Sequence, residues 1–213
     1  MQDRTLAFGF VACLALLGSA RSAATDAPPV TAPKLSETQL GPNEELIAVI
    51  QVTHGKEAWG TIEVRLHDKY APAHVQSFVK LAESGFYDGI AFHRVGPESF
   101  VQGGDPLSRD ADPANDGTGG PGYDLLPEPN DKEHARGTVA AASMGKRESG
   151  SQFFIDLKDH PEWNGKYTVF GSVVAGIEVA DKIAAQPRKG DHPVDPCTMT
   201  VKVEKRTRKQ KLY

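Results

Sequence analysis

One stretch of the sequence decides the fold: Ala91-Phe92-His93-Arg94-Val95-Gly96-Pro97-Glu98-Ser99-Phe100-Val101-Gln102-Gly103-Gly104-Asp105. It contains two short apolar runs, residues 90–95 and 100–102, which a Gly-Pro turn joins and a Gly-Gly pair ends. This pattern is typical of a tight β-connection. Arg94 and Gln102 stand within the two runs, where part of each polar side chain is expected to be buried and to need a partner. The stretch therefore predicts two strands and also a functional site.

Four further motifs flank this stretch. They are Phe86-Tyr87-Asp88-Gly89, Gly117-Thr118-Gly119-Gly120, Gly150-Ser151-Gln152-Phe153-Phe154-Ile155 and Gly165-Lys166-Tyr167-Thr168-Val169-Phe170-Gly171. Together, the five motifs resemble the cyclophilin family of peptidyl-prolyl isomerases, in that family's order and spacing, over about residues 47–203. Five motifs in order are far more specific than any one of them. The resemblance implies the family's fold, a closed eight-stranded antiparallel β-barrel capped by two α-helices.

Local patterns agree with a mainly β fold that has two helices. Apolar side chains recur at helical spacing in residues 72–83 and again in residues 176–185. Strand-forming runs cover residues 47–52, 61–66, 139–142, 151–155, 168–174 and 199–203. Residues 104–136 are rich in Gly, Pro, Asp and Asn, and a loop of that length is either functional or a sign of a wrong assignment. The resemblance favours a loop beside the substrate groove.

The composition is that of one globular domain of ordinary size. The chain has 213 residues, of which 39% are hydrophobic and 24% are charged. Its formal net charge of −4 gives no reason to expect a nucleic-acid partner. We expect a monomer with a Pro-rich linker or arm at residues 25–43, an isomerase domain at residues 44–205 and a basic tail at residues 206–213.

Residues 1–24 have the pattern of a secretory signal peptide. Arg4 precedes an apolar run at residues 6–17, and small residues follow, so that cleavage can follow either Ala20 or Ala24. The apolar run is shorter than the roughly 20 residues that a membrane-spanning helix needs. We therefore expect an exported protein without a transmembrane segment after cleavage.

The cysteines and the C-terminal residues narrow the expected destination. A lipoprotein would use Cys13, but the residues before it are a poor match to the usual pattern. Signal cleavage leaves Cys197 alone, so no intrachain disulfide is expected. The chain ends Lys-Gln-Lys-Leu-Tyr, which is no retention signal of the endoplasmic reticulum. We favour a bacterial periplasm, with secretion to the exterior as the alternative.

The chemistry that the resemblance implies requires a fixed cation beside an apolar pocket. Rotation about an X-Pro bond meets a barrier of about 18–20 kcal/mol, because the nitrogen lone pair is delocalised into the carbonyl. A catalyst need only stabilise the twisted transition state, in which the nitrogen is pyramidal and accepts a hydrogen bond. Arg94 suits this task because its guanidinium stays charged and presents its donors in a rigid fork. We expect no metal ion or organic cofactor.

The resemblance assigns the other site residues by their position in the motifs. Phe154 forms the floor of the proline pocket and, with Arg94 and Gln102, completes the expected catalytic set. The expected substrate-binding residues are Phe100, Trp163 and Tyr167 as walls, Gln152 as a residue that hydrogen-bonds the substrate or orients the arginine, Ala142 and Ser143 as an edge for the substrate backbone, and Gly117. Side chains alternate along a strand, so only one of Phe153 and Phe154 can face the pocket, and the family's register selects Phe154.

Three departures distinguish this chain from the family pattern. Glu98-Ser99 replaces the usual Gly-Phe pair and leaves Phe100 as the only aromatic residue there. Aligned without a gap, Glu162 stands where the family has the Trp that binds cyclosporin, so weak binding of that drug is expected. Ala141-Ala142-Ser143-Met144 replaces a Met-Ala-Asn-Ala run, which keeps a backbone edge and loses the Asn side chain.

The seven histidines are not expected to take part in the chemistry. His93 follows Phe92 and is expected to be a hydrogen-bonded core histidine rather than a base or a metal ligand. The other six show no metal-ligand spacing and are expected at the surface: His54, His67, His74, His134, His160 and His192.

The leading hypothesis is an exported peptidyl-prolyl cis-trans isomerase that acts on X-Pro bonds of unfolded polypeptides and so assists folding. An alternative is a proline-peptide binding or chaperone module, because Glu98, Ser99 and Glu162 alter the expected pocket. A third hypothesis is a structural barrel anchored through its Pro-rich arm. Isomer exchange in an Ala-Pro peptide separates the first two, since the module would bind the peptide without accelerating exchange.

Overall fold

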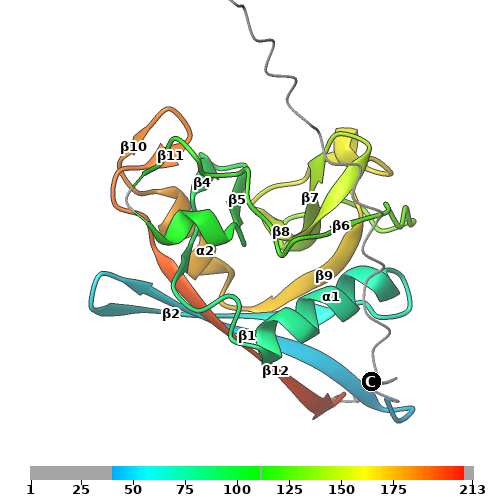
Figure 1. Ribbon diagram of the computed structural model, residues 1–213. Coiled ribbons are helices and arrows are strands. Elements are labelled where there is room, and N and C mark those ends of the chain that lie inside the picture. Colours follow the sequence, from blue (N-terminus) through cyan, green and yellow to red (C-terminus); the bar gives the residue numbers. More distant parts are fainter. Residues whose placement is uncertain (1–39, 111, 209–213) are drawn as a thin grey trace, which may run out of the picture.

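The computed structural model describes residues 40–110 and 112–208 (Figure 1). The predicted signal peptide at residues 1–24 and most of the predicted linker lie outside the described residues, as do residues 209–213 of the predicted tail. No helix in the described part of the chain is both long enough and apolar enough to cross a bilayer.

The described chain is mainly β with two α-helices. The strands are β1 (Glu44–His54), β2 (Glu57–Leu66), β3 (Ile90–Ala91), β4 (Arg94–Gly96), β5 (Phe100–Gly103), β6 (Asp124–Leu125), β7 (Thr138–Met144), β8 (Arg147–Asp156), β9 (Val169–Ala175), β10 (Arg188–Lys189), β11 (His192–Pro193) and β12 (Thr198–Thr207). The helices are α1 (Pro72–Glu83) and α2 (Ile177–Ala184), with short 3-10 turns η1 (Pro106–Arg109) and η2 (Pro161–Trp163).

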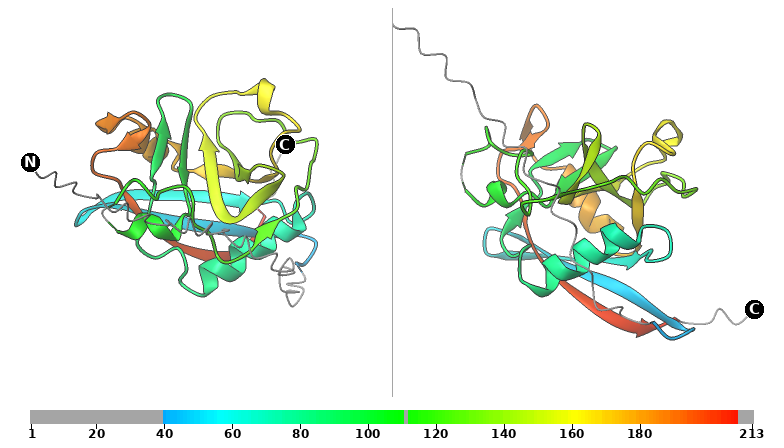
Figure 2. Two further views of the ribbon diagram at one scale, coloured as in Figure 1. Left: turned by 45° about the horizontal axis from the view of Figure 1, so that its top comes forward. Right: turned by 45° about the vertical axis from the view of Figure 1, so that its right-hand side comes forward.

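The main sheet runs in the order β3-β12-β1-β2-β9-β7-β8-β5-β4, and all its pairings are antiparallel. Its two end strands, β3 and β4, are separated in sequence by only Phe92 and His93. The segment from β3 to β4 therefore leaves one edge of the sheet and joins the other. Counted as one interrupted strand, it makes eight strands around the barrel. This confirms the predicted fold class, and the curl is visible in Figure 2.

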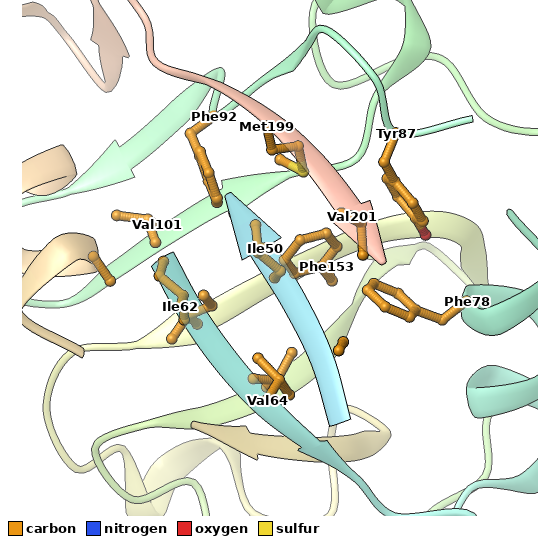
Figure 3. Packing of buried hydrophobic residues seen from close by; sticks show 14 of the residues in the cluster. Ile50, Ile62, Val64, Phe78, Tyr87, Phe92, Val101, Phe153, Met199 and Val201 are labelled. Atoms are coloured by element: carbon orange, nitrogen blue, oxygen red, sulfur yellow. The ribbon is translucent and has the colours of Figure 1, made fainter. Parts of the chain in front are cut away.

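The barrel interior is filled by apolar side chains from every wall. Figure 3 shows side chains of β1, β2, β5, β8 and β12 meeting there with aromatic rings from α1 and the loop after it. The ring of Phe153 from β8 lies 5.6 Å from the ring of Phe78 from α1, in an edge-to-face arrangement. Helix α1 packs against β8, β9 and β12, whereas α2 packs against β2, β4 and β5. The two helices thus cover different parts of the barrel, and one side of the β5-β8-β7 surface stays open.

The Gly-Gly pair at the end of β5 stops that strand for a steric reason. Gly104 has a φ of +92°, which side-chain-bearing residues rarely adopt. A Cβ at Gly104 would also collide with the backbone carbonyl oxygen of Ser151 on β8. The chain therefore turns away from the barrel at this point and begins the long loop that the composition predicted.

The structure corrects some of the predicted boundaries. Residues 90–95 do not form one strand, because regular pairing stops at Phe92 and His93. Strand β12 extends to Thr207, two residues into the predicted tail, because residue 206 still pairs with Glu45 of β1. Helix α1 covers the predicted residues 72–83, and α2 is shorter than predicted by one residue at each end.

Candidate active site

An open cavity of about 260 Å³ lies on the outer face of the barrel, over β4, β5, β7 and β8. Its lining consists of Arg94, Phe100, Gln102, Ala142, Ser143, Phe154, Trp163 and Tyr167. We call it the aromatic cavity. Eight of the ten site residues that the sequence indicated thus come together, from segments up to 73 residues apart.

Strand register places the central row of this cavity. Arg94 on β4 pairs with Gln102 on β5, Gln102 pairs with Phe154 on β8, and Phe154 pairs with Ala140 on β7. Residues directly opposite each other in adjacent strands point to the same face of a sheet. The cation, the amide and the aromatic floor therefore form one continuous row on the outside of the barrel.

Strand β8 supplies both the barrel core and the floor of the cavity. Phe153 is 1% exposed and belongs to the large interior cluster, whereas Phe154 belongs to a small separate cluster with Ala140 and Val169. Phe100, Trp163 and Tyr167 pack on that small cluster. The predicted choice of Phe154 as the ring that faces the pocket agrees with this placement.

Three aromatic rings surround Phe154 in edge-to-face contact. The Phe154 ring centroid lies 5.5 Å from Trp163 at an interplanar angle of 89° and 5.3 Å from Tyr167 at 83°. Phe100 lies 6.4 Å away at 72°. Edge-to-face contacts of this kind hold the rings apart as rigid apolar walls. A small ring such as that of proline suits a space of this shape.

Arg94 forms the polar end of the cavity. Its Nε donates to Oδ2 of Asp191 at 2.6 Å, and its Nη1 donates to Oε1 of Gln102 at 3.4 Å. The guanidinium carbon lies 5.2 Å from the centre of the Phe100 ring, a cation–π distance. The hydrogen bond from Arg94 lowers the pKa of Asp191 below its ordinary value. The Arg94 side chain is 48% exposed, so part of it is buried and it has a partner, as expected.

Gln152 lies behind the cavity and not in its lining. Gln102 donates through Nε2 to Oε1 of Gln152 at 3.1 Å, and Gln152 donates through Nε2 to the carbonyl oxygen of Gly119 at 2.8 Å. Gln152 is 2% exposed. Because the Gln102 amide nitrogen bonds to Gln152, its oxygen is turned toward Arg94. The structure thus favours the orienting role of Gln152 over direct contact with a substrate.

Gly117 is not placed at the aromatic cavity. It has a φ of +84°, and the nearest atom to a Cβ built there is Nε2 of His93, at 3.7 Å. The glycine-rich turn therefore brings Gly117 beside His93 and outside the lining of the aromatic cavity, and its contact with the substrate stays a prediction.

Ala142 and Ser143 present a free strand edge. Pairing between β7 and β9 covers only Thr138–Ala140, and β7 has an irregularity between Ala141 and Ser143 on the β8 side. The Ala141 N–H still donates to the carbonyl oxygen of Thr168, just before β9, at 3.0 Å. Beyond Ala141 the backbone of β7 runs along the cavity without a partner from β9. An extended peptide can pair with an edge of this kind.

Trp163 lines the wall of the cavity, as predicted, whereas Glu162 is not part of the lining. The imidazole of His160 stacks on the Trp163 indole at a centroid distance of 3.7 Å and an angle of 8°. His160 in turn contacts Ser99 Oγ through Nε2 at 3.0 Å and Glu162 Oε1 through Nδ1 at 2.9 Å. The hydrogen bond from His160 lowers the pKa of Glu162. Ser99, one of the departures from the family motif, therefore anchors the aromatic wall.

A second buried histidine supports the cavity floor. The ring of His134 lies 5.9 Å from Phe154 at 12°, nearly parallel to it. Its Nδ1 is 2.8 Å from Oδ2 of Asp156, and both side chains are 0% exposed. Burial raises the pKa of Asp156, and the hydrogen bond with His134 opposes that rise.

The expected surface position is wrong for three histidines, because His74, His134 and His160 are buried. His93 is buried as expected, but neither of its ring nitrogens has a hydrogen-bond partner among the described residues. The partners of His74 and His134 lie 22 to 74 residues away in sequence, so no local pattern could have revealed them. The same holds for Asp191, which is 97 residues from Arg94.

Comparisons with known proteins agree with this arrangement. Residues 49–204 match the family model described as cyclophilin type peptidyl-prolyl cis-trans isomerase/CLD. The chain is 42% identical over 132 residues to a peptidyl-prolyl cis-trans isomerase of Synechococcus elongatus, covering 62% of this chain and 85% of the relative. It is 44% identical over 125 residues to peptidyl-prolyl cis-trans isomerase B of Bacillus subtilis, covering 58% and 82%.

Solved structures show the same fold. A crystal structure of a cyclophilin type peptidyl-prolyl cis-trans isomerase of Cryptosporidium parvum matches with a TM-score of 0.66 at 25% identity, covering 78% of this chain and 99% of that one. A structure of the same protein in the presence of the dipeptide Ala-Pro matches with a TM-score of 0.63 at 25% identity, covering 77% and 99%.

Proposed function

The chain belongs to the cyclophilin type peptidyl-prolyl cis-trans isomerase family and is such an isomerase, and on that premise we propose how its aromatic cavity acts on an X-Pro bond. The proline ring lies on Phe154, between Trp163 and Tyr167. The residues that precede proline extend along the free edge at Ala142. This places the X-Pro nitrogen toward the polar end of the cavity, where Arg94 stands.

Arg94 lowers the barrier electrostatically. In the planar ground states the proline nitrogen is a poor acceptor, because its lone pair is delocalised. In the twisted transition state the nitrogen is pyramidal and can accept a hydrogen bond from a guanidinium N–H. A fixed cation therefore stabilises the transition state more than either ground state, which is the condition for catalysis. The observation that carries this proposal is the position of Arg94 in the same strand row as the floor residue Phe154.

Gln102 and Gln152 keep the arginine in place. The Gln102 oxygen accepts from Arg94 Nη1, and Gln152 fixes the Gln102 amide from behind. Asp191 accepts from Nε on the opposite side. The terminal guanidinium nitrogen Nη2 has no hydrogen-bond partner among the described residues, so it is the donor that we assign to the substrate.

The proposal is tested by the cis-to-trans exchange of an Ala-Pro peptide, measured by NMR with the wild-type protein and two variants. Uncatalysed exchange takes tens of seconds, so modest catalysis is measurable. Arg94→Ala is expected to reduce kcat/KM by about 100-fold, the effect typical of losing one electrostatic donor. Arg94→Lys keeps the positive charge but loses the planar arrangement of donors, so its kcat/KM is expected to lie between those of the wild type and Arg94→Ala. Peptide binding without faster exchange in the wild type would instead support the binding or chaperone module.

We also propose that the protein is exported and acts as a monomer on X-Pro bonds of unfolded polypeptides, in a bacterial periplasm or outside the cell. The apolar run at residues 6–17 and the small residues after it support export. Cell fractionation with N-terminal sequencing of the mature protein tests this proposal. Cleavage after Ala20 or Ala24 is expected, and a full-length protein in the cytoplasmic fraction would contradict it. The molar mass of the mature protein, measured by analytical ultracentrifugation, tests the proposed monomer, and the mass of a dimer would contradict it.

A further inference from the structure

A second cavity has a volume of about 300 Å³. Its lining consists of His93, Ser108, Asp110, Pro113, Asp116, His192, Pro193, Val194, Asp195 and Pro196. We call it the acidic cavity. His93 directly precedes Arg94, and His192 directly follows Asp191. The two cavities therefore lie beside consecutive residues of the chain, and the Arg94–Asp191 ion pair joins the two segments that carry His93 and His192.

His93 is the least satisfied polar group in the wall of the acidic cavity. It is 2% exposed, and neither Nδ1 nor Nε2 has a partner at normal hydrogen-bond geometry among the described residues, although the backbone of Ala91 is near enough to raise its pKa. Leaving a buried polar group without a partner is costly. Burial lowers the pKa of His93 to about 4, so its imidazole is neutral at pH 7 and offers one lone pair as an acceptor. The wall of the cavity thus contains an acceptor that lacks a donor.

Asp116 adds an unpaired negative charge to the same wall. Within the described part of the chain its carboxylate has neither a hydrogen bond nor an ion pair. Burial raises the pKa of Asp116, and the nearby charge of Asp105 raises it further, whereas His192 of the same lining lowers it. A carboxylate in that position is stabilised by a cation that enters the cavity.

The rest of the lining continues this pattern. Asp110 and Asp195 also contribute carboxylates, and the latter forms a 2.9 Å ion pair with His54 at the rim. The remaining lining has two polar residues, Ser108 and His192, and an apolar part made of Pro113, Pro193, Val194 and Pro196. A ligand that suits both features has a positively charged head with several donors and an apolar stem.

We propose that the acidic cavity is a subsite for an arginine side chain of the same peptide whose proline occupies the aromatic cavity. Guanidinium is planar and has five N–H donors, so it can bond to acceptors on several sides at once. Its methylene stem can lie along the proline and valine surface. The volume is at the lower end of ligand pockets and suits one side chain. The inference rests on the proposed function and adds to it a preference among substrates.

The test compares peptides that differ only in charge at one position. A host peptide with a single Ala-Pro bond carries arginine, or its uncharged near-isostere citrulline, at each position in turn on both sides of the proline. Exchange is followed by NMR at low and at high salt. At one position of the peptide, kcat/KM is expected to be about threefold to fivefold higher with arginine than with citrulline, which matches the free energy of a partly exposed ion pair. This difference is expected to shrink at high salt.

Variants of the acidic cavity test whether the arginine preference arises there. Asp116→Asn keeps the shape of the side chain and removes its charge, so it is expected to abolish the arginine preference without changing the rate for the citrulline peptide. Glu178→Gln, an exposed carboxylate in the first turn of α2 and outside both linings, is the matched control and is expected to keep the preference. Equal rates for arginine and citrulline at every register would overturn the proposal. An arginine preference that persists in the double variant Asp116→Asn/Asp195→Asn would also overturn it.

Failure of the proposed catalysis can be told apart from failure of the arginine subsite. If the citrulline peptides exchange no faster with protein than without it, the proposed catalysis fails, and the affinity of the peptides then tests the subsite. Calorimetry with the same peptide pairs measures affinity directly. Tighter binding of the arginine peptide, lost in Asp116→Asn, still supports the subsite, and equal affinities contradict it.

Discussion

Ser99 shows how one residue that departs from a family pattern can be structurally compensated. A phenylalanine at this position would contribute an aromatic ring, whereas Ser99 contributes a hydroxyl group that contacts His160. His160 stacks on Trp163, and Glu162 holds the other ring nitrogen of His160. The wall of the aromatic cavity is therefore held from behind by a polar chain that begins at the altered position.

His160 is consequently expected to position Trp163 without contacting the substrate. His160→Ala removes the stacked ring, and an aromatic contact of this kind is worth about 0.5–1.5 kcal/mol. We expect KM to rise about threefold to tenfold, with kcat changed by less than about twofold, because Arg94 and its partners stay in place. In a Trp59→Phe background, the emission of Trp163 is expected to shift to the red as the ring gains solvent.

Glu162→Gln is the control for this prediction, because it keeps the His160 ring and an acceptor for it. It is expected to behave much like the wild type in both measurements. A fall in kcat at unchanged KM in the His160 variant would show that the residue acts on the transition state, and the positioning role would then be wrong.

The role of a residue could be predicted where the residue stands in a short motif. It could not be predicted where the role depends on a partner that is distant in the sequence. Arg94, Gln102 and Phe154 stand in two motifs whose internal alternation indicates which side chains share a face. Asp191 and His160 have no such signal, since an aspartate in a loop and a histidine after a strand are compatible with many structures. The position of Gly117, beside His93 and outside the lining of the aromatic cavity, was not predictable for a related reason, because the course of a long glycine-rich loop depends on what it packs against.

At the scale of elements, α1 begins without a capping side chain of its own. Its N-cap residue is Ala71, and the carboxylate of Glu128 from the long loop accepts hydrogen bonds from the backbone N–H groups of Ala73 and His74, both at 3.0 Å. The ring of His74 contacts Glu128 at 2.7 Å and Glu148 at 3.0 Å. A buried histidine between two carboxylates thus ties the helix to the loop and to β8.

This cluster predicts a pH dependence of stability. Burial alone would lower the pKa of His74, but its contacts with Glu128 and Glu148 outweigh burial and raise the pKa above 6.5. Burial likewise opposes the shift at Glu128, where hydrogen bonds from His74 and the helix backbone lower the pKa below 4.5. The histidine contribution is complete below pH 6.5 and is lost as pH rises through the folded-state pKa. The glutamate contribution is complete above pH 4.5 and is lost as pH falls through its own folded-state pKa.

Urea unfolding between pH 4 and pH 9 measures this effect. The free energy of unfolding is expected to decline on the alkaline side in the wild type and to decline less in His74→Gln. His67→Gln is the control: burial lowers the pKa of His67, so its linkage has the opposite sign and the alkaline decline should persist. An alkaline decline of equal size in His74→Gln and the wild type would contradict the assignment.

The elements themselves were largely predictable, because their signals are periodic and local. The apolar stripe of α1 lies at helical spacing, and the predicted strand runs all fall within or beside observed strands. The interruption at Phe92 and His93 was not predictable. It arises because the chain crosses there from one sheet edge to the other, which is a property of barrel closure and not of the residues themselves.

At the scale of the whole molecule, closure of the barrel and construction of the site depend on the same segment. The chain from Ile90 to Gly96 joins β12 on one side to β5 on the other, and it carries His93 and Arg94, which line the acidic and the aromatic cavity. A fluctuation that opens the barrel at this seam would therefore also separate Arg94 from Gln102. The site is expected to have no stability independent of the barrel.

The two tryptophans of the chain test this expectation, because they report on separate regions. Trp163 lies in the wall of the aromatic cavity, whereas Trp59 lies on β2, with its ring 3.9 Å from the ammonium of Lys182 on α2. Urea unfolding of Trp59→Phe followed at Trp163, and of Trp163→Phe followed at Trp59, is compared with circular dichroism of each variant. If the barrel and the site unfold together, fluorescence and circular dichroism give the same midpoint within each variant. An earlier fluorescence midpoint at Trp163 alone would mean that the cavity wall unfolds on its own, and catalysis would then depend on an equilibrium that the rest of the barrel does not control.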